Sequence, residues 1–439
     1  MAALRRLLRW GVTVASWGWL FSLTSAHAAT FSVTNRSDLA DAAPGDGICA
    51  TAKGVCTLRA AIQETNALAG ADTINLPRGV YVLTGGELAI ADDLTLLGAG
   101  PAATVIKSIR KARVLSTATG VALTMDGVRV QGGRADAGGG LLNNGTATLS
   151  NVTFLGNRAA SPAFGLGAGI NNAGTVTLSN VNFARNQATG SAGAFGGGIY
   201  NTGSVAAADV SFTVNFASGC GGALYNYGGA TSLLRATIAG NRALNSGGGI
   251  FNQSGTVDVS ATTLARNRAT QTGGGVFTYA QVTLANVTMT ANRAAIGAGL
   301  VSGSFGAATL TNVTINGNRA TQGGGLFCDH GTVTLHNSVV AFNPPKNCDG
   351  TTAVTSLGYN IDSGTTCGFA ATGDLSNLDP KLGVLRNNGG PTKTCALLPG
   401  SPAIDAGDNV NCPPSDQRSD PRPAGALPVC DMGAYEAQP

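Results

Sequence analysis

Charged and aromatic residues are scarce in this sequence: 11% of its 439 residues are charged, 5% are aromatic, and only 3 are histidines. Beyond residue 28, no apolar stretch is long enough to span a bilayer. Amphipathic helical periodicity is also missing, except over residues 57–69. Without a basic field, nucleic acid receives little electrostatic attraction. These absences argue against nucleic-acid binding, a membrane-spanning mature chain and a helical fold.

Residues 1–28 have the pattern of a secretory signal peptide. Three arginines precede a mostly apolar stretch from Trp10 to Leu23, and residues 26–28, Ala-His-Ala, form a small-x-small cleavage site. Removal of this leader leaves 24 basic and 23 acidic residues. All 9 cysteines remain, which suits an oxidising compartment. We therefore expect a nearly neutral protein that is secreted or held at the cell surface.

Glycine, by contrast, is abundant, with 64 residues, and it marks an internal repeat of 24 to 29 residues. Each copy holds a Gly-rich hexapeptide, short Thr/Val/Leu runs and an asparagine. A repeat of this length predicts a solenoid. Short alternating strands without a helix favour a right-handed parallel β-helix over a leucine-rich repeat or a left-handed β-helix. The hexapeptides begin at residues 138, 167, 196, 221, 247, 273, 297 and 323.

The predicted fold is all-β, a single right-handed parallel β-helix of about 10–12 coils. We expect a cap with an amphipathic helix over residues 29–71, the β-helix over 72–343, and terminal coils with a loop-rich, disulfide-bonded region over 344–439. Stacked equivalent strands should place like side chains in columns, and stacked amides hydrogen-bond along the axis. The aliphatic column, which must face the core, contains Leu141, Ile170, Ile199, Leu224, Ile250, Val276, Leu300 and Leu326. Asparagine columns at the corners contain Asn157, Asn186, Asn215, Asn241, Asn267, Asn292, Asn318 and Asn343; Asn151, Asn180, Asn286, Asn312 and Asn337; and Asn143, Asn172, Asn201, Asn226 and Asn252.

The odd number of cysteines leaves at least one thiol unpaired. Cys220 is expected to be a buried thiol, and no partner is assigned to Cys328 or Cys395. The expected disulfides are Cys49–Cys56, Cys348–Cys367 and Cys412–Cys430.

Both ends of the mature chain carry family-like motifs. "CTLRAAIQETNA" (56–67) resembles the Cys-Ser-Leu-Arg-Glu-Ala motif that opens a group of exported bacterial β-helix proteins, with departures at Thr57 and Ala60. Motifs near the C-terminus resemble the domain called choice-of-anchor Q, which often precedes a surface-sorting signal. These resemblances imply export and a place at the cell surface. The C-terminal motifs occupy residues 357–362, 379–394, 398–407, 416–423 and 430–436.

Two shorter motifs recur in the coils. Gly-Gly-Ala-Leu occurs at 221–224, and Phe-x-x-Asn occurs at Phe154–Asn157, Phe183–Asn186 and Phe212–Asn215. They are similar to the repeats of chlamydial polymorphic outer-membrane proteins, whose passengers are adhesive. The resemblance implies adhesion.

Catalytic constellations are hard to find. Glycoside hydrolysis usually needs a pair of carboxylates, yet between residues 138 and 343 the acidic residues are Asp209, Asp258 and Asp329, in different columns, and no lysine occurs there. His330 and His336 are expected to be solvated, so we assign no catalytic residue, metal or cofactor. An upstream site at Asp126 and Asp136, or at Asp92 and Asp93, stays open. A C-terminal acidic set is expected to cap turns, with Ca²⁺ binding as the alternative: Asp405, Asp408, Asp416, Asp420 and Asp431.

Two rows of side chains should point outward, because strand residues alternate between the two faces. An aromatic row could stack on sugar rings, or simply stack across strands beneath a loop. A row of arginines could bind an acidic glycan, or be solvated corner residues. The candidate ligand-binding residues are Tyr200, Tyr225, Phe251, Phe277 and Phe327 in the first row, and Arg242, Arg268, Arg293 and Arg319, preceded by Arg158, in the second.

The sequence therefore predicts a secreted or cell-surface structural and binding module of adhesin type, recognising a glycan or another surface polymer. The alternative is a polysaccharide-active enzyme, a lyase or a glycoside hydrolase, built on the same β-helix.

Overall fold

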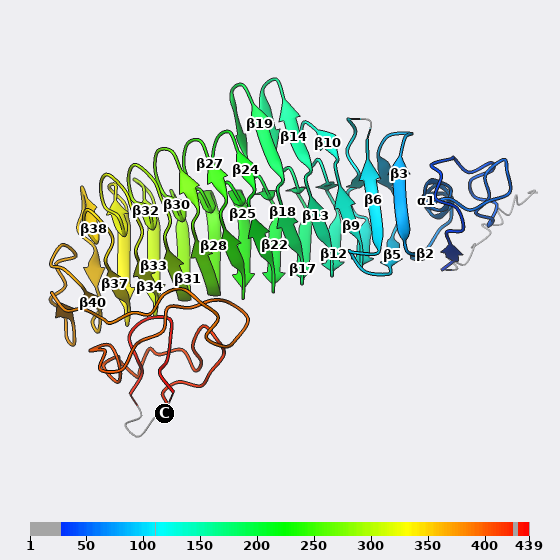
Figure 1. The fold of residues 1–439 in the computed structure, drawn as a ribbon. Helices are drawn as coiled ribbons and strands as arrows, with labels where there is room; N and C mark the ends of the chain where they lie inside the picture. The colour runs from blue at the N-terminus through cyan, green and yellow to red at the C-terminus, as the bar shows by residue number, and fades with distance from the viewer. Residues whose placement is uncertain (1–27, 110, 425–428, 439) are drawn as a thin grey trace, which may run out of the picture.

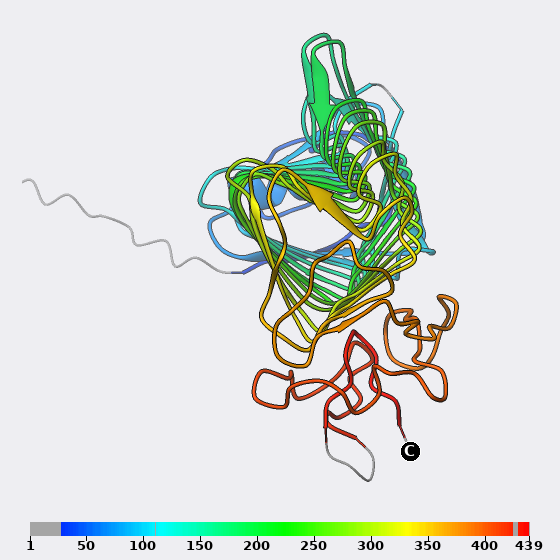
Figure 2. The same cartoon turned by 90° about the vertical axis from the view of Figure 1, so that its left-hand side faces the viewer.

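The chain folds into a right-handed parallel β-helix of about 11 coils, with one short helix at its N-terminal end (Figure 1). A computed structural model describes residues 28–109, 111–424 and 429–438, so all but the last residue of the expected leader lies outside the described residues. Figure 2, a view along the rod, shows the coils superimposed on a three-sided outline, with the C-terminal loops beside one face. The predicted fold class is confirmed.

Three parallel sheets, here called faces A, B and C, run along the rod, and each strand pairs with its equivalent one repeat away. Face A contains β4 (Leu88–Ile90), β7 (Leu115–Thr117), β11 (Leu141–Asn143), β16 (Ile170–Asn172), β21 (Ile199–Asn201), the first parts of β25 (Leu224–Leu234) and β28 (Ile250–Ala265), β30 (Val276–Thr278), β32 (Leu300–Ser302), β35 (Leu326–Cys328) and β38 (Cys348–Gly350). Face B contains β1 (Thr30–Ser32), β2 (Asp72–Leu76), β5 (Leu94–Gly98), β8 (Ala122–Asp126), β12 (Thr146–Ser150), β17 (Thr175–Ser179), β22 (Ser204–Ala208), the end of β25, the middle of β28, the first part of β31 (Gln281–Thr290), β33 (Ala307–Thr311), β36 (Thr332–His336) and β39 (Thr355–Ser356).

Face C completes the coil, and a smaller sheet forms the corner between faces C and A. Face C contains β3 (Gly79–Leu83), β6 (Thr104–Ser108), β9 (Arg129–Gln131), β13 (Thr153–Leu155), β18 (Asn182–Ala184), β23 (Ser211–Thr213), β26 (Thr237–Ala239), the ends of β28 and β31, β34 (Thr314–Asn316), β37 (Val339–Ala341), β40 (Ile361–Asp362) and β41 (Leu375–Ser376). The corner sheet contains β10 (Arg134–Ala135), β14 (Arg158–Ser161), β19 (Gln187–Gly190), β24 (Phe216–Ala217), β27 (Arg242–Ala243) and β29 (Arg268–Ala269), and a two-stranded sheet of β15 (Phe164–Leu166) and β20 (Gly193–Phe195) extends it outward.

The interior of the rod is a set of apolar files. Every residue of the expected aliphatic column, from Leu141 to Leu326, is completely buried and pairs with its equivalent in the next coil. On face C, Phe154, Phe183 and Phe212 stack face to face with ring centroids 5.1 and 4.8 Å apart. The register therefore keeps apolar surface on apolar surface from coil to coil.

Two of the asparagine columns are also interior, and they satisfy the buried backbone at the corners. Both the backbone N–H and the Nδ2 of Asn241 donate to Oδ1 of Asn267 at 3.0 Å, and Asn267 repeats this with Asn292 at 2.9 and 3.1 Å. The Nδ2 of Asn267 also donates to the carbonyl of Ile238 at 2.8 Å. A second ladder runs from Asn143 to Asn252. The predicted stacking of amides along the axis is confirmed.

The third asparagine column has the left-handed backbone conformation that a sharp corner needs. Asn151, Asn180, Asn286, Asn312 and Asn337 have φ between 50° and 53°. Asparagine adopts this region more readily than other residues with a side chain. Backbone geometry thus favours asparagine at this corner, although Asp209, Arg235 and Ala261 adopt the same conformation in other coils.

A helical cap covers the N-terminal end of the rod. The helix α1 (Leu58–Ala67) begins at the N-cap Thr57, whose side chain accepts from the Ala60 N–H, and packs on β2 and β4. Arg59 ties the cap to the first coils, because it donates to Asp38 at 2.8 Å and to the carbonyl of Gly86 at 2.8 Å. The predicted helix is present.

The C-terminal loops cover part of face C (Figure 2). Gln417 lies at the contact: Thr288 Oγ1 donates to its Oε1 at 2.6 Å, and its Nε2 donates to Thr263 Oγ1 at 3.0 Å. Further along the rod, the side chain of Asn337 donates to the carbonyl of Asp408 at 2.9 Å. Thr263 of β28, Thr288 of β31 and Asn337, at the corner between β36 and β37, therefore fix the position of these loops.

All three predicted disulfides, Cys49–Cys56, Cys348–Cys367 and Cys412–Cys430, are present. Cys220, Cys328 and Cys395 are free. Cys328 and Cys395 are buried, whereas Cys220 is only partly buried, in contrast to the expectation of a buried thiol.

Replacement of Asn267 by Ala should lower the free energy of unfolding by about 3 kcal/mol or more, since it removes the buried acceptor of the backbone N–H and of one Nδ2 hydrogen of Asn241, and a donor to the carbonyl of Ile238. Denaturant unfolding followed by circular dichroism measures this. The matched control is Gln187→Ala, which removes an exposed amide and should change stability by less than about 0.5 kcal/mol. Equal effects of the two substitutions would contradict the ladder's role.

Candidate functional site

The aromatic row forms the stack that its spacing predicts, but most of it is covered. The rings of Tyr225, Phe251 and Phe277 lie parallel, with centroids 5.0 and 4.9 Å apart. Their exposed fractions are only 6, 4 and 4%. Tyr200 and Phe327, at the ends of the row, are partly buried.

Side chains from strand β20 and from the turn after β30 close over this stack. Phe195 lies 4.7 Å from the Tyr225 ring, and Tyr279 meets Phe277 edge-on at 4.7 Å. The row is therefore a second apolar cluster outside the coil, and a sugar ring has no access to its central members. This corrects the picture of an exposed stripe, and it agrees with the alternative of cross-strand stacking under a loop.

The arginine row follows the corner sheet and is exposed. Arg242 pairs with Arg268 through β27 and β29, and isolated bridges continue the register to Arg293 and Arg319. Each side chain is exposed. Adjacent coils are about 4.8 Å apart, so these four guanidinium groups are spread over roughly 14 Å.

Arg158 belongs to the same column but is separated from the other arginines. Its register continues through Gln187 and Phe216 to Arg242, and the guanidinium of Arg242 lies 5.8 Å from the Phe216 ring. The continuous charged segment is therefore Arg242 to Arg319, which we call the arginine row.

The arginine row borders a shallow groove of about 350 Å³ whose remaining lining is alanine and threonine. An alanine follows every arginine of the row, so no bulky neighbour covers the guanidinium groups. Within the described residues, no carboxylate forms an ion pair with any of these guanidinium groups, and no acceptor of the chain takes a hydrogen bond from them. Arg268, Arg293 and Arg319 line the groove, and Arg242 continues the row beyond it, so the groove itself presents three of the four unpaired positive charges. The recurring Arg-Ala dipeptide is the sequence signal for it.

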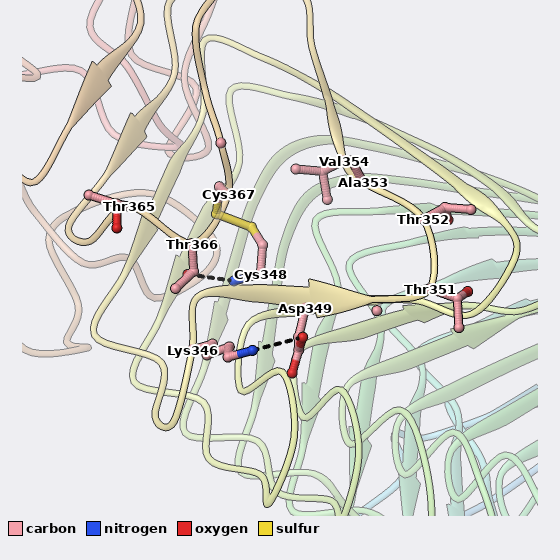
Figure 3. Close-up of a pocket in the computed structure, with 12 residues that line it drawn as sticks. Lys346, Cys348, Asp349, Thr351, Thr352, Ala353, Val354, Thr365, Thr366 and Cys367 are labelled. Carbon is pink, nitrogen blue, oxygen red and sulfur yellow. Dashed lines mark hydrogen bonds and ion pairs between the residues drawn. A yellow bond between two sulfur atoms is a disulfide. The ribbon is translucent and has the colours of Figure 1, made fainter.

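A second pocket, of about 410 Å³, lies at the C-terminal end of the coils (Figure 3). Its two charged residues neutralise each other, since Lys346 Nζ lies 3.2 Å from Asp349 Oδ1. The Cys348–Cys367 disulfide and threonines form much of the remaining wall, and Thr366 accepts from the Cys348 N–H at 3.2 Å. This pocket offers no free charge, which distinguishes it from the groove.

The acidic residues of the coils are dispersed. Asp209 forms a bidentate ion pair with Arg235 at a corner, Asp258 lies on face B opposite Ser232 and Thr283, and Asp329 contacts His330. Upstream, Asp126 accepts from Asn151 and Asp93 accepts from the Ala122 N–H. In the described ranges, no group of three or more His, Cys, Asp or Glu side chains is placed to hold a metal ion.

One histidine differs from its expected environment. His330 is exposed, as predicted, but His336 is 6% exposed. Its Nε2 lies 3.2 Å from Asp408 Oδ2, and His336 helps to lower the pKa of that carboxyl, after the larger effect of the Val410 N–H. Docking of the C-terminal loops buries this histidine, which strand alternation alone does not predict.

The C-terminal acidic residues are used inside the loops. Asp416 accepts from the Arg418 and Asp420 N–H groups, and Asp431 accepts from the N–H of Asp405. Backbone capping thus occupies oxygens of Asp416 and Asp431, and also of Asp408, which accepts from the Val410 N–H, in agreement with the expectation of turn caps for these three. The side chain of Asp420 instead pairs with Arg418.

The comparison with family models agrees with one of the resemblances. Residues 209–227 match the Chlamydia polymorphic membrane protein repeat. The match spans both predicted motifs, Phe212–Asn215 and the Gly-Gly-Ala-Leu at 221–224. It covers one repeat only. No match was found among curated proteins.

Similar solved structures include two β-helix enzymes. The A-module of the Azotobacter vinelandii mannuronan C-5 epimerase AlgE4 is 14% identical, with 80% of this chain and 98% of that chain covered and a TM-score of 0.37. Pectate lyase Pel9A is 15% identical, with coverages of 94% and 97% and a TM-score of 0.41. At these low values neither activity is carried over to this chain.

Among the described residues, no helix is long and apolar enough to cross a membrane. The three disulfides fit an extracellular location. The signal peptide and the resemblance to the choice-of-anchor Q domain stay predictions.

The charges of the C-terminal loops form a buried network. The guanidinium of Arg418 lies 3.8 Å from the ring centroid of Tyr435 and donates to Asp416 at 2.8 Å. Glu436 is completely buried, with Arg422 Nε 3.6 Å from its Oε2. Burial raises the pKa of Glu436 to about 7, against the opposing effect of two backbone N–H donors and Arg422. The same burial lowers the pKa of Arg422.

The raised pKa of Glu436 predicts that stability falls with rising pH. Its contribution is complete below the ordinary pKa of about 4.5 and is lost as the pH rises through about 7. The melting temperature, followed by circular dichroism, should therefore decrease between about pH 5 and pH 8. Glu436→Gln, which resembles the protonated acid, should reduce this slope, and Glu87→Gln, at a partly exposed carboxyl, should leave it unchanged. A slope that Glu436→Gln does not alter would contradict the assignment.

Phe251→Ala tests the covered aromatic stack. Loss of a buried phenyl ring should lower the free energy of unfolding by about 3–5 kcal/mol, measured by denaturant unfolding. If the folded variant is assayed at low temperature, its affinity for acidic polysaccharide should be unchanged, because the ring is not accessible. A loss of binding with unchanged stability would instead place the ring in a ligand site.

Proposed function

We propose that the protein is a secreted or cell-surface binding module of adhesin type, and that the arginine row binds an acidic glycan or another polyanionic surface polymer. The observation that carries this proposal is the set of four exposed, unpaired guanidinium groups repeated once per coil, three of which line one groove.

Electrostatics favours a polymeric anion over a small one. Like charges stacked on adjacent strands repel each other, and a ligand with regularly repeated carboxylates or sulfates would relieve this repulsion at several coils together. Guanidinium groups bind such oxyanions by paired, charge-assisted hydrogen bonds. The mature chain is nearly neutral overall, so the positive charge of the arginine row is a local feature of the surface. A local row of charge suits a ligand that lies along the groove.

The surface location is supported by two independent features. The matched repeat comes from a family described as polymorphic membrane proteins. The disulfides, one in the N-terminal cap and two in the C-terminal region, are typical of exported proteins. Export by the leader over residues 1–28 belongs to the same proposal.

Arg268→Ser combined with Arg293→Ser should weaken binding to an acidic polysaccharide such as alginate or polygalacturonate about tenfold. Exposed ionic contacts are each worth up to about 1 kcal/mol, and about 1.4 kcal/mol corresponds to a factor of ten in Kd. Binding is measured by biolayer interferometry on the immobilised polymer. It should also weaken with added salt.

The matched control is Arg78→Ser combined with Arg185→Ser, which removes the same charge from exposed sites outside the row and should leave Kd unchanged. Equal affinity of the wild type and the Arg268/Arg293 variant would overturn the proposal. A reducing-end assay on the same polymers distinguishes the enzyme alternative, because new chain ends would show turnover.

A further inference from the structure

Ala29, the first residue after the expected leader, forms hydrogen bonds through both its backbone N–H and its carbonyl. The backbone N–H of Ala29 donates to Asp72 Oδ1 at 2.7 Å, and the carbonyl of Ala29 accepts from the Thr73 N–H at 2.8 Å. Strand β1 then pairs with β2, with Thr30 opposite Thr73. Ala29 is therefore the first residue that the parallel ladder fixes.

Asp72, which accepts the hydrogen bond from the Ala29 N–H, is a buried acid that no basic side chain of the described residues pairs with. Its exposed fraction is 0%, and its Oδ2 is buried without a hydrogen-bond partner. Within the described residues no basic side chain forms an ion pair with it. Its charged neighbour is Asp92, which acts with burial to raise the pKa of Asp72. A buried carboxylate in this condition is strongly destabilising unless a positive charge reaches it.

We propose that Asp72 is the counter-ion site for the α-ammonium group of Ala29, which is created when the Ala28–Ala29 peptide bond is hydrolysed. An endopeptidase that recognises small-x-small sites adds water across this bond. The oxygen of the water remains on Ala28 as its carboxylate, and Ala29 leaves with an amine that takes up the proton and becomes the ammonium.

The new ammonium group lies beside the buried carboxylate of Asp72, which needs a positively charged partner. Before cleavage, the Ala29 amide has one hydrogen, which Asp72 Oδ1 already accepts. Afterwards the same nitrogen has three hydrogens and a full positive charge, so it can also reach Oδ2, which lacks a donor. Asp92 lies on the adjacent coil and adds negative potential at Asp72, and the carbonyl of the next residue, Asp93, accepts from the Asp72 N–H.

Removal of the leader would therefore complete the N-terminal edge of the rod as well as release the protein. Ala28, on the leader side of the bond, is exposed, and Ala29 is partly buried. A cut one residue earlier or later would place the ammonium away from Asp72. The structure thus assigns a single functional processing position, which the small-x-small motif alone does not require.

The test compares two full-length mature chains: one released from a fusion with Ala29 as its first residue, and one that keeps Met-Ala28 before it. Each is made with Asp72 and with Asp72→Asn. The chain that begins at Ala29 should melt several degrees higher than the extended chain, and Asp72→Asn should abolish this difference. Asp72→Asn removes the buried charge, so the extended chain remains folded for the comparison.

The pH dependence gives a second measurement. Pairing raises the pKa of the α-amino group above its ordinary value of about 8, so the gain in melting temperature is complete below that value and is lost as the pH rises through the raised one. Equal melting temperatures of the two Asp72 chains, or a difference that persists when both chains carry Asp72→Asn, would overturn the proposal. So would a secreted protein whose first residue, by mass spectrometry, is not Ala29.

Discussion

The axial register of the coils is the constraint on which every other feature depends. Because each strand pairs with its equivalent one repeat away, every side chain meets its counterpart above and below. Inside the rod this matching is favourable: leucine packs on isoleucine, phenylalanine stacks on phenylalanine, and each asparagine of the ladder serves as donor to one neighbour and acceptor to the other. The buried amides therefore have partners only while the register is kept.

Outside the rod the same register produces both candidate surfaces. It aligns Tyr225, Phe251 and Phe277, whose matching is favourable and is completed by a cover of side chains from β20 and the turn after β30. It also aligns the arginines, whose matching is unfavourable and has no compensating carboxylate in the described part of the chain. The first row stabilises the fold, and the second carries charge that a ligand could neutralise. The C-terminal loops occupy part of face C, whereas the side chains of the arginine row at the corner stay exposed.

Most of the architecture could be predicted from the sequence, because a solenoid repeats its local interactions and the alignment of its glycines and asparagines already gives the register. The columns from Leu141 to Leu326 and from Asn157 to Asn343, the helix near residue 58 and the three disulfides all follow from short-range patterns. Strand alternation also shows that the aromatic and arginine rows leave the coil. It does not show what covers them.

The features that could not be predicted involve contacts between distant segments. The cover over Phe251 comes from side chains of neighbouring coils, and the burial of His336 comes from a loop about 70 residues further along the chain. The contact between Asp72 and Ala29 could not be predicted either. In the sequence, an aspartate at the start of an apolar strand resembles any turn residue. Repetition makes local structure predictable, but docking of non-repeating segments has no such signal.

The most direct test of the axial register is a distance measurement along the arginine column. Nitroxide labels on cysteines at positions 158 and 319, in a Cys220→Ser background, are separated by six strand pairings. Pulsed electron paramagnetic resonance should then give a narrow distribution centred near about 29 Å, since each coil adds about 4.8 Å. Labels at 187 and 319 should lie one coil closer. A broad distribution, or distances that do not decrease by one coil spacing, would contradict the account.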